Sequence, residues 1–315
     1  GVYRCYGPKG VVIEGFEDFV FDGAGAELVF RRPPTYPMVP SWDHDSSRAN
    51  FVIRNCRFVG CHNEGNNGVV YRTNGTGILY IEDTTFEFCS AKIRSSAVEG
   101  LGVTMIDRCK FIGCCRPAGN SGSNVVWFNA LGSRIRNSEF VRCVTAGGTS
   151  VNDNNDSVPG NIASGMNSYA LDDCVVSNCY SASEFGYGTP LVNFANNSRA
   201  SGCRLVGNLS TVKPTGEKRG YGLVGTSCRG AREISFDNCL FKENTIRALG
   251  LDGTCSSSYA LGIIGNAIKG VRVATVGCVF DSNRAEGVVA EGVSAIRCRG
   301  VLSAAPDSAS DSQIG

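Results

Sequence analysis

The sequence lacks an excess of charge of either sign, because its 30 Lys and Arg residues against 29 Asp and Glu residues give a net charge of +1. A near-neutral chain exerts no long-range attraction on nucleic acid or on an anionic membrane. No apolar run approaches the roughly 18 residues that a membrane span needs. Amphipathic helical periodicity is also missing. We therefore expect no nucleic-acid partner, no direct membrane span and no helical domain.

Common catalytic and metal signatures are missing too. The chain has no phosphate-binding loop, no G-x-S-x-G element and no H-E-x-x-H element. Cys61-His62 and Cys114-Cys115 are not followed by a second ligand pair at zinc-site spacing. Gly1 opens the chain without a charged segment and an apolar segment after it, so we expect a processed or trimmed start. We expect neither a resident metal nor a conventional hydrolase centre.

Glycine and cysteine are abundant. Forty glycines, with many Asn and Asp residues among β-branched and aromatic runs, predict a chain that turns often between short strands. Sixteen cysteines favour an oxidising compartment, and so do four N-x-S/T sequons, at Asn74, Asn155, Asn196 and Asn208. The alternative is a reduced protein whose cysteines act as small core hydrophobes. We expect a secreted or cell-surface protein.

A nine-residue unit recurs along most of the chain. Residues 53–61 read I-R-N-C-R-F-V-G-C, and related units occupy residues 81–89, 106–114, 135–143 and 171–179, with weaker copies at 200–208, 236–244 and 275–283. A second signal of the G-V-V type precedes most copies, as in residues 68–70 and 287–289. Short strands repeated at this spacing indicate a solenoid. The fold class predicted is all-β, a right-handed parallel β-helix of about 9–10 coils with at least two strands per coil and room for a third.

Each position of the unit has a physical interpretation. The third position holds residues that tolerate a left-handed backbone: Asn55, Asp83, Asn137, Asp173, Gly202, Asn238 and Gly277. The sixth position is aromatic in six copies, Phe58, Phe86, Phe111, Phe140, Phe241 and Phe280, with Val176 and Leu205 in the others. Stacked coils would align these side chains as an internal ladder at about 4.8 Å per rung.

The last position of the unit is Cys in five copies and Asn in three, at Asn208, Asn244 and Asn283. Inward Asn side chains would hydrogen-bond their equivalents in neighbouring coils. Cysteines one rung apart lie within the Cα range of a disulfide. If the protein is oxidised, we expect the pairs Cys61–Cys89, Cys114–Cys143 and Cys174–Cys203; buried free thiols are the alternative.

These repeats resemble the pectin-lyase-like right-handed β-helix superfamily. Residues 11–15 (V-V-I-E-G) and 21–26 (F-D-G-A-G-A) are similar to the first coils of that superfamily, and the likeness extends from about residue 10 to residue 300. The alternation of an N-C-x-F-x-x-C/N unit with a G-V-V unit is also similar to polymorphic outer-membrane adhesins, although their G-G-A-I strand is not reproduced. The resemblance implies a fold and not a chemistry. We expect one domain over residues 1–300, with residues 301–315 as a flexible tail or linker.

The resemblance implies catalytic candidates, because the superfamily's enzymes mostly cleave acidic polysaccharides. Asp172-Asp173 is the adjacent aspartate pair, but Asp173 also occupies the turn position of its repeat. His44 lies in W-D-H-D, which is similar to the W-x-D-H element of pectate lyases, although it precedes the first strong repeat. Catalytic candidates are thus Asp172, Asp173 and His44. The acidic loop 152–156 offers oxygens for a possible Ca²⁺ ion, without a defined ligand spacing.

Insertions between the repeat and the G-V-V unit should crowd one side of the solenoid, where they either make a binding wall or are tolerated insertions without a ligand. We expect a non-catalytic extracellular or surface scaffold for adhesion, glycan contact or assembly of a larger structure, with a glycan or protein partner. The alternative is a polysaccharide lyase or glycoside hydrolase acting on an acidic polysaccharide. A line of exposed carboxylates, Arg or Lys on one strand face would favour that alternative.

Overall fold

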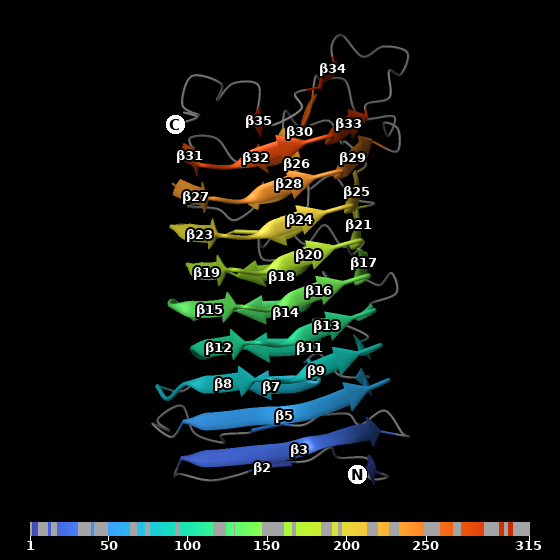
Figure 1. Ribbon diagram of the computed structural model, residues 1–315, viewed down its shortest axis with the longest axis vertical. Coiled ribbons are helices and arrows are strands. Elements are labelled where there is room, and N and C mark those ends of the chain that lie inside the picture. Colours follow the sequence, from blue (N-terminus) through green and yellow to red (C-terminus); the bar gives the residue numbers. More distant parts are fainter. Residues whose placement is uncertain are drawn as a thin grey trace, which may run out of the picture.

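The computed structural model shows a stack of parallel β-coils that rises from the N-terminal end to the C-terminal end (Figure 1). The described part contains strands and no helix, so it holds no helix long and apolar enough to cross a membrane. The residues that the structure describes are 2–5, 12–13, 18–30, 39–40, 50–63, 68–72, 76–91, 95–115, 124–128, 130–146, 161–165, 168–183, 191–194, 197–212, 220–226, 233–248, 259–266, 272–286, 296–298 and 302–304.

The largest sheet has 17 strands and bends at one corner of every coil, which we call turn 1. Its strands before turn 1, or spanning it, are β3 (Phe19–Phe30), β5 (Phe51–Val59), β8 (Leu79–Glu82), β12 (Thr104–Asp107), β15 (Ser133–Arg136), β19 (Tyr169–Asp172), β23 (Ser198–Ser201), β27 (Glu233–Asp237) and β31 (Arg272–Val276). Its strands after turn 1 are β1 (Val2–Cys5), which pairs with the second half of β3, and β9 (Thr85–Glu87), β13 (Lys110–Ile112), β16 (Glu139–Val141), β20 (Val175–Ser177), β24 (Arg204–Val206), β28 (Leu240–Lys242) and β32 (Val279–Asp281).

Two further stacks complete the coils. A five-stranded sheet holds β17 (Val144–Ala146), β21 (Tyr180–Ser183), β25 (Leu209–Val212), β29 (Thr245–Ala248) and β33 (Arg284–Glu286), and a two-stranded sheet below it pairs β6 (His62–Asn63) with β10 (Ser90–Ala91). A nine-stranded sheet holds β7 (Val70–Arg72), β11 (Ser95–Gly100), β14 (Asn124–Phe128), β18 (Asn161–Gly165), β22 (Val192–Asn193), β26 (Gly220–Thr226), β30 (Tyr259–Asn266), β34 (Ile296–Cys298) and β35 (Leu302–Ala304). The pair β2 (Val12–Ile13) and β4 (Val39–Pro40) forms a separate two-stranded sheet.

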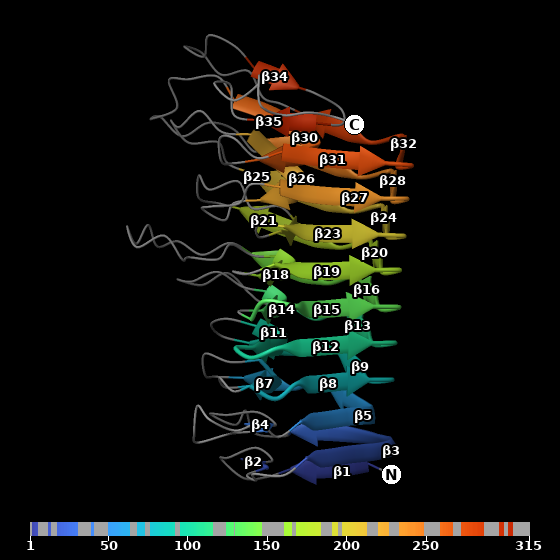
Figure 2. The same ribbon diagram turned by 90° about the vertical axis from the view of Figure 1, so that its left-hand side faces the viewer.

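The solenoid predicted from the repeats is confirmed. From β3 to β31, nine strands of the described chain follow one another as parallel neighbours, one for each coil. A middle coil has four strand positions, β14, β15, β16 and β17, because the nine-residue unit itself bends into separate strands. Figures 1 and 2 show the chain passing from β8 on the left-hand side to β9 at the front as it rises, which is the right-handed sense.

Turn 1 lies at the third position of the unit, as predicted. Asn55, Asp83, Asn137, Asp173 and Asn238 have φ between 46° and 53°, and Gly202 and Gly277 lie at 63° and 62°. Arg108 fills the same place with φ of 51°. Short polar residues and glycine adopt this left-handed conformation most readily, which explains the composition of the column.

A second corner, turn 2, lies five residues further on in every coil and was not predicted. Gly60, Gly113, Gly207 and Asn178 are typical of a left-handed corner, but Phe88, Arg142, Glu243 and Ser282 adopt the same conformation with φ between 52° and 55°. The N–H groups of Phe88, Arg142 and Glu243 donate to carbonyl oxygens of the next coil, as Phe88 N does to Ile112 O at 2.8 Å. The ladder therefore imposes the conformation on residues that do not favour it.

The aromatic ladder predicted at the sixth position is confirmed. Successive rings stack with centroid distances of 5.1, 5.1 and 4.5 Å and interplanar angles of 12° or less, in the order Phe58, Phe86, Phe111 and Phe140. Phe241 and Phe280 stack at 4.8 Å in the later coils. Burial of these rings along the axis removes apolar area from water in every coil that carries one.

Two columns of small side chains flank the ladder. Just after turn 1 come Cys56, Thr84, Cys109, Ser138, Cys174, Cys203, Cys239 and Cys278, and just after turn 2 come Cys61, Cys89, Cys114, Cys143, Cys179, Asn208, Asn244 and Asn283. Most of the thiols contact a carbonyl oxygen of the preceding coil, as Cys143 Sγ does with Phe111 O at 3.3 Å. Burial raises the pKa of the Cys89 thiol well above its usual value.

The six cysteines of the predicted disulfides lie in these columns, and all six are free thiols in the structure. Cys61 and Cys89 occupy neighbouring coils, as do Cys114 and Cys143, and Cys174 and Cys203. The free thiols agree with the packing role described above. Whether the pairs form in an oxidising compartment stays a prediction.

The predicted boundary at residue 300 needs one correction. β35 lies within the predicted tail, and it pairs in parallel with β30 through Ile264 and Leu302. Residues 302–304 thus belong to the solenoid, while residues 305–315 lie outside the described part.

Candidate functional site

The outer face of the strands before turn 1 carries two columns of side chains, because alternate residues of a strand point to opposite faces. The first column runs Tyr80, Met105, Arg134, Ala170 and Arg199 from β8 to β23. The second runs Asp22, Arg54, Glu82, Asp107, Arg136, Asp172 and Ser201 from β3 to β23. The register of the ladder thus brings together acids and bases that are 25 to 40 residues apart in sequence.

Asp107 is the centre of one ion-pair network. Arg136 Nη2 donates to Asp107 Oδ2 at 3.1 Å, and Arg108 Nη1 donates to the same oxygen. Asn137 Nδ2 donates to the other oxygen, Oδ1, at 3.0 Å. The side chain of Asp107 is 5% exposed. This carboxylate is therefore a fixed acceptor that holds two guanidinium groups in place.

Asp172 is the centre of a second network one coil above Arg136. Arg134 Nε donates to Asp172 Oδ2, and Arg199 Nη2 lies 3.7 Å from Asp172 Oδ1. The side chain of Asp172 is 8% exposed. Arg134 and Arg199 thus approach it from the coils below and above.

The accessible charge of this surface is cationic. While the two aspartates are nearly buried, the side chains of Arg108, Arg134, Arg136 and Arg199 are 48, 41, 50 and 54% exposed. We call these four residues, with Asp107 and Asp172 beneath them, the arginine surface. A guanidinium keeps its charge throughout the physiological range and still has N–H donors for an anion.

Ion pairs at turn 1 extend the arginine surface toward the corner. Arg108 Nε and Nη2 donate to the two oxygens of Asp83 at 2.8 and 2.9 Å, and this contact lowers the pKa of Asp83. Lower in the stack, the Ala24 N–H, the Asn55 amide and the Arg54 guanidinium lower the pKa of Asp22. Both carboxylates are therefore ionised at neutral pH.

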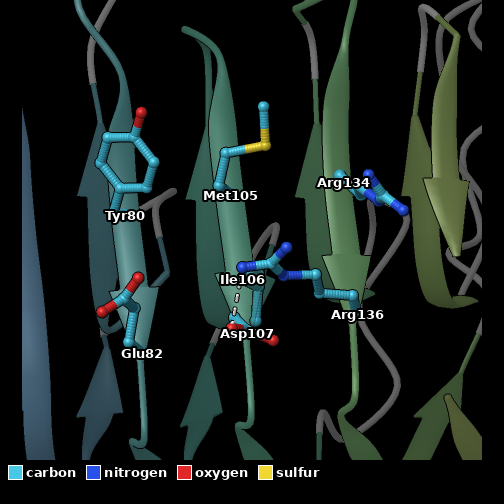
Figure 3. A pocket seen from close by; sticks show the side chains of 7 residues that line it. All are labelled: Tyr80, Glu82, Met105, Ile106, Asp107, Arg134 and Arg136. Carbon is cyan, nitrogen blue, oxygen red and sulfur yellow. Dashed lines mark hydrogen bonds and ion pairs between the residues drawn. The ribbon is translucent and has the colours of Figure 1, made fainter. Parts of the chain in front are cut away.

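A pocket of about 260 Å³ lies on this face and is lined by Tyr80, Glu82, Met105, Ile106, Asp107, Arg134 and Arg136. Figure 3 shows Tyr80, Met105 and Arg134 in one row, and Glu82, Asp107 and Arg136 in the row beside it. Arg136 reaches across toward Asp107 of the neighbouring strand, while Arg134 points away from it. The volume is below the roughly 300–1,000 Å³ of most small-molecule sites, so the pocket fits part of a ligand.

The structure separates the predicted aspartate pair. Asp172 ends β19 and its carboxylate belongs to the arginine surface, whereas Asp173 is exposed in turn 1 with φ of 52°. His44 and the acidic loop 152–156 lie outside the described residues. Within the described ranges, no group of three or more His, Cys, Asp or Glu side chains is arranged to hold a metal ion.

One of the four predicted glycosylation sites, Asn208, lies in the described part of the chain. Asn208 is 1% exposed, and its amide Nδ2 donates to Val176 O at 2.8 Å and to Asn244 Oδ1 at 2.9 Å. A glycan on this nitrogen is incompatible with the folded ladder, which corrects the expectation for Asn208. Asn74, Asn155 and Asn196 lie outside the described residues.

The arginine surface was missed because its members look unrelated in sequence. Most repeats contribute one or two charges beside turn 1, and the sign changes between most neighbouring repeats, although Glu82 and Asp107 are both acidic. Aligning the repeats and comparing the residue just before turn 1 from coil to coil would have found Glu82, Asp107, Arg136 and Asp172.

The sequence matches no protein-family model, and no curated protein matches it significantly. Among solved structures, the catalytic domain of a GH87 α-1,3-glucanase in complex with nigerose aligns at 9% identity with a TM-score of 0.28. An aspartate-to-alanine variant of such a domain, in complex with tetrasaccharides, aligns at 10% identity with a TM-score of 0.29. Both alignments cover 97% of this chain but 63% of the other.

Proposed function

We propose that this chain is a non-catalytic β-helix scaffold that binds an acidic glycan along the arginine surface. The single observation that carries the proposal is the contrast in exposure between the guanidinium groups and the aspartates that hold them. A ligand approaching from solvent meets these guanidinium groups first, although Asp83, Asp107 and Asp172 offset three of their four positive charges and Glu82 adds a carboxylate to the pocket.

The paired aspartates lower the cost of using these arginines for binding. A long side chain loses rotamer freedom when it is fixed by a ligand. Arg134 and Arg136 are already anchored on Asp172 and Asp107, so much of that loss precedes binding. Their remaining N–H groups suit a carboxylate or sulfate in two-pronged contacts.

The shape of the site suits a polymer better than a small molecule. Coils repeat about every 4.8 Å, so the arginines from β12 to β23 extend over roughly 14 Å along the axis. The pocket beside them takes one unit of a chain, with Tyr80 available to contact a sugar ring. A glycan lying parallel to the solenoid axis would meet all of these groups together.

The proposal includes the biological setting expected from the sequence. We propose a secreted or cell-surface position, because the cysteine content and the three sequons outside the described residues are consistent with it. There the protein would contact a glycan or a protein surface partner and take a place in a larger extracellular assembly. We also propose that the chain is related to the pectin-lyase-like superfamily.

A polysaccharide hydrolase or lyase at the same face is the second candidate, and the line of exposed arginines is the feature expected for it. Glu82 and Asp107 are register neighbours, and a separation near one rung is close to the roughly 5 Å between the carboxyl groups of retaining glycosidases. However, Asp107 accepts hydrogen bonds from three side chains, so it is poorly placed to attack a sugar or to donate a proton. Binding without turnover is the better-supported function.

Binding of oligogalacturonate to wild-type protein, measured by isothermal titration calorimetry, tests the proposal. We expect Arg134→Gln plus Arg136→Gln to weaken binding at least about tenfold, because a hydrogen bond to a charged group contributes roughly 1.5–3 kcal/mol. Each aspartate keeps other partners in this variant, since Arg199 remains at Asp172, and Arg108 and Asn137 remain at Asp107.

Arg204→Gln is the matched control, because Arg204 is an exposed arginine on β24, past turn 1 from this surface. Equal binding by wild type and the double variant, or equal loss in Arg204→Gln, would contradict the proposal. Release of reducing ends or of unsaturated sugars during the titration would instead establish the hydrolase or lyase alternative.

A further inference from the structure

A serine and a histidine meet on another face of the solenoid, just beyond turn 2. The outer column there runs His62, Ser90, Cys115, Val144 from one coil to the next, joined by parallel pairing of their backbones. These side chains follow the inward cysteines Cys61, Cys89, Cys114 and Cys143, so strand alternation turns them outward. All of them retain some exposure to solvent.

His62 and Ser90 form a direct hydrogen bond. His62 Nδ1 lies 2.8 Å from Ser90 Oγ, and the backbone Ser90 N–H donates to Cys61 O at 2.8 Å. In the tautomer with its proton on Nε2, Nδ1 accepts the serine hydroxyl proton. A hydroxyl donating to an imidazole at this distance is the arrangement that activates a serine nucleophile.

Apolar side chains lie beside this pair. Phe88, two residues before Ser90, is 56% exposed, with its backbone in the left-handed conformation at φ of 52°. Its ring lies across Gly113 of the next coil, where a Cβ would come within 2.7 Å of Phe88 Cδ1. Val144, two coils above Ser90, is 39% exposed. An acyl group placed on Ser90 would therefore find apolar surface at Phe88 and Val144.

We propose that Ser90 and His62 are a nucleophile and base that hydrolyse carboxylic esters of small apolar acyl groups. Ser90 Oγ attacks the ester carbonyl as its proton passes to His62 Nδ1. The bond to the alcohol then breaks, and the alcohol leaves with that proton. Water attacks the acyl-serine, again giving a proton to Nδ1. The carboxylic acid departs as the proton returns to Ser90 Oγ.

This activity is separate from glycan binding, since it uses a different face and different residues. Reaction with a fluorophosphonate probe tests it, because the serine oxygen forms a bond to phosphorus, fluoride leaves and His62 takes the proton. We expect labelling that maps by mass spectrometry to the peptide containing Ser90, together with hydrolysis of p-nitrophenyl acetate. Both signals should be lost in Ser90→Ala.

His62→Gln keeps a hydrogen-bonding side chain but cannot act as a base of comparable strength. We expect it to slow labelling about 100-fold, which is within the range for general-base assistance. Ser177→Ala on β20 is the control and should leave both signals unchanged. Far-ultraviolet circular dichroism and thermal melting confirm that each variant retains its fold.

Absence of label on Ser90, equal labelling of wild type and His62→Gln, or ester hydrolysis that persists in Ser90→Ala would each overturn the proposal. None of these results bears on oligogalacturonate binding, which the Arg134 and Arg136 variants test independently.

Discussion

Replacement of Asn244 by alanine removes the middle member of the asparagine ladder. Asn244 Oδ1 accepts from Asn208 N at 3.1 Å and from Asn208 Nδ2 at 2.9 Å. Asn244 Nδ2 donates to Leu205 O at 2.8 Å and to Asn283 Oδ1 at 2.9 Å. Asn244 is fully buried, so water does not take over these four contacts in the folded protein.

The expected loss follows from the donors left behind. Two donors on Asn208 become buried without an acceptor, at about 1–3 kcal/mol each. We therefore expect Asn244→Ala to lower the free energy of unfolding by about 4 kcal/mol, a large part of the roughly 5–15 kcal/mol typical of a folded domain. Asn244→Cys should be somewhat less costly, because its thiol can still donate to Leu205 O, as Cys179 Sγ does to Phe140 O at 3.5 Å, and its sulfur is a weak acceptor for Asn208.

Urea unfolding monitored by circular dichroism measures the change in midpoint for the two variants. Hydrogen exchange at the Asn208 amide gives a local readout, because that N–H donates to the side chain being removed. A loss below about 1 kcal/mol in Asn244→Ala, with unchanged protection of the Asn208 amide, would refute the ladder as a source of stability.

Three further predictions concern the ladder, a turn and the thiols. Phe111→Ala should lower the free energy of unfolding in urea by about 3–5 kcal/mol, because the ring is fully buried between two others. Phe280→Ala, at the half-buried end of the ladder, should lower it clearly less, and equal losses would contradict a continuous ladder. Asp83 has a lowered pKa in the folded state, so its contribution to the free energy of unfolding is present above its unfolded pKa near 3.9 and fades as pH falls below it. The stability difference between wild type and Asp83→Asn should therefore vanish in acid. A difference that persists there would contradict the ion pair with Arg108. In protein produced through an oxidising secretory route, peptide mapping should find Cys61 linked to Cys89, Cys114 to Cys143 and Cys174 to Cys203, whereas sixteen alkylated cysteines would contradict a secreted protein.

The repeat was readable because the solenoid uses the same residue types at the same place in every coil. Asn, Asp and Gly adopt the left-handed backbone of a corner most readily, and the buried sixth position of each coil favours Phe. Turn 1 and the aromatic ladder were therefore both predicted. Turn 2 was missed since Phe88, Arg142 and Glu243 carry no local sign of a left-handed backbone. There, hydrogen bonds to the next coil outweigh local preference.

The candidate sites depend on alignment between coils more than on motifs. The pairs Asp107–Arg136 and His62–Ser90 are 29 and 28 residues apart, and variable insertions set which residues become neighbours. A search for adjacent aspartates pointed to Asp172 and Asp173, yet the corner between them sends the two carboxylates into different surroundings. The register between neighbouring coils was therefore needed to find the pairs Asp107–Arg136 and His62–Ser90.

Arginine footprinting tests the proposed function most directly. Wild-type protein would be treated with phenylglyoxal with and without saturating oligogalacturonate, and the modified arginines mapped by mass spectrometry. We expect the oligosaccharide to protect Arg134, Arg136 and Arg199 while leaving Arg204 as reactive as before. Protection that is absent, or equal at all four arginines, would contradict glycan binding at the arginine surface.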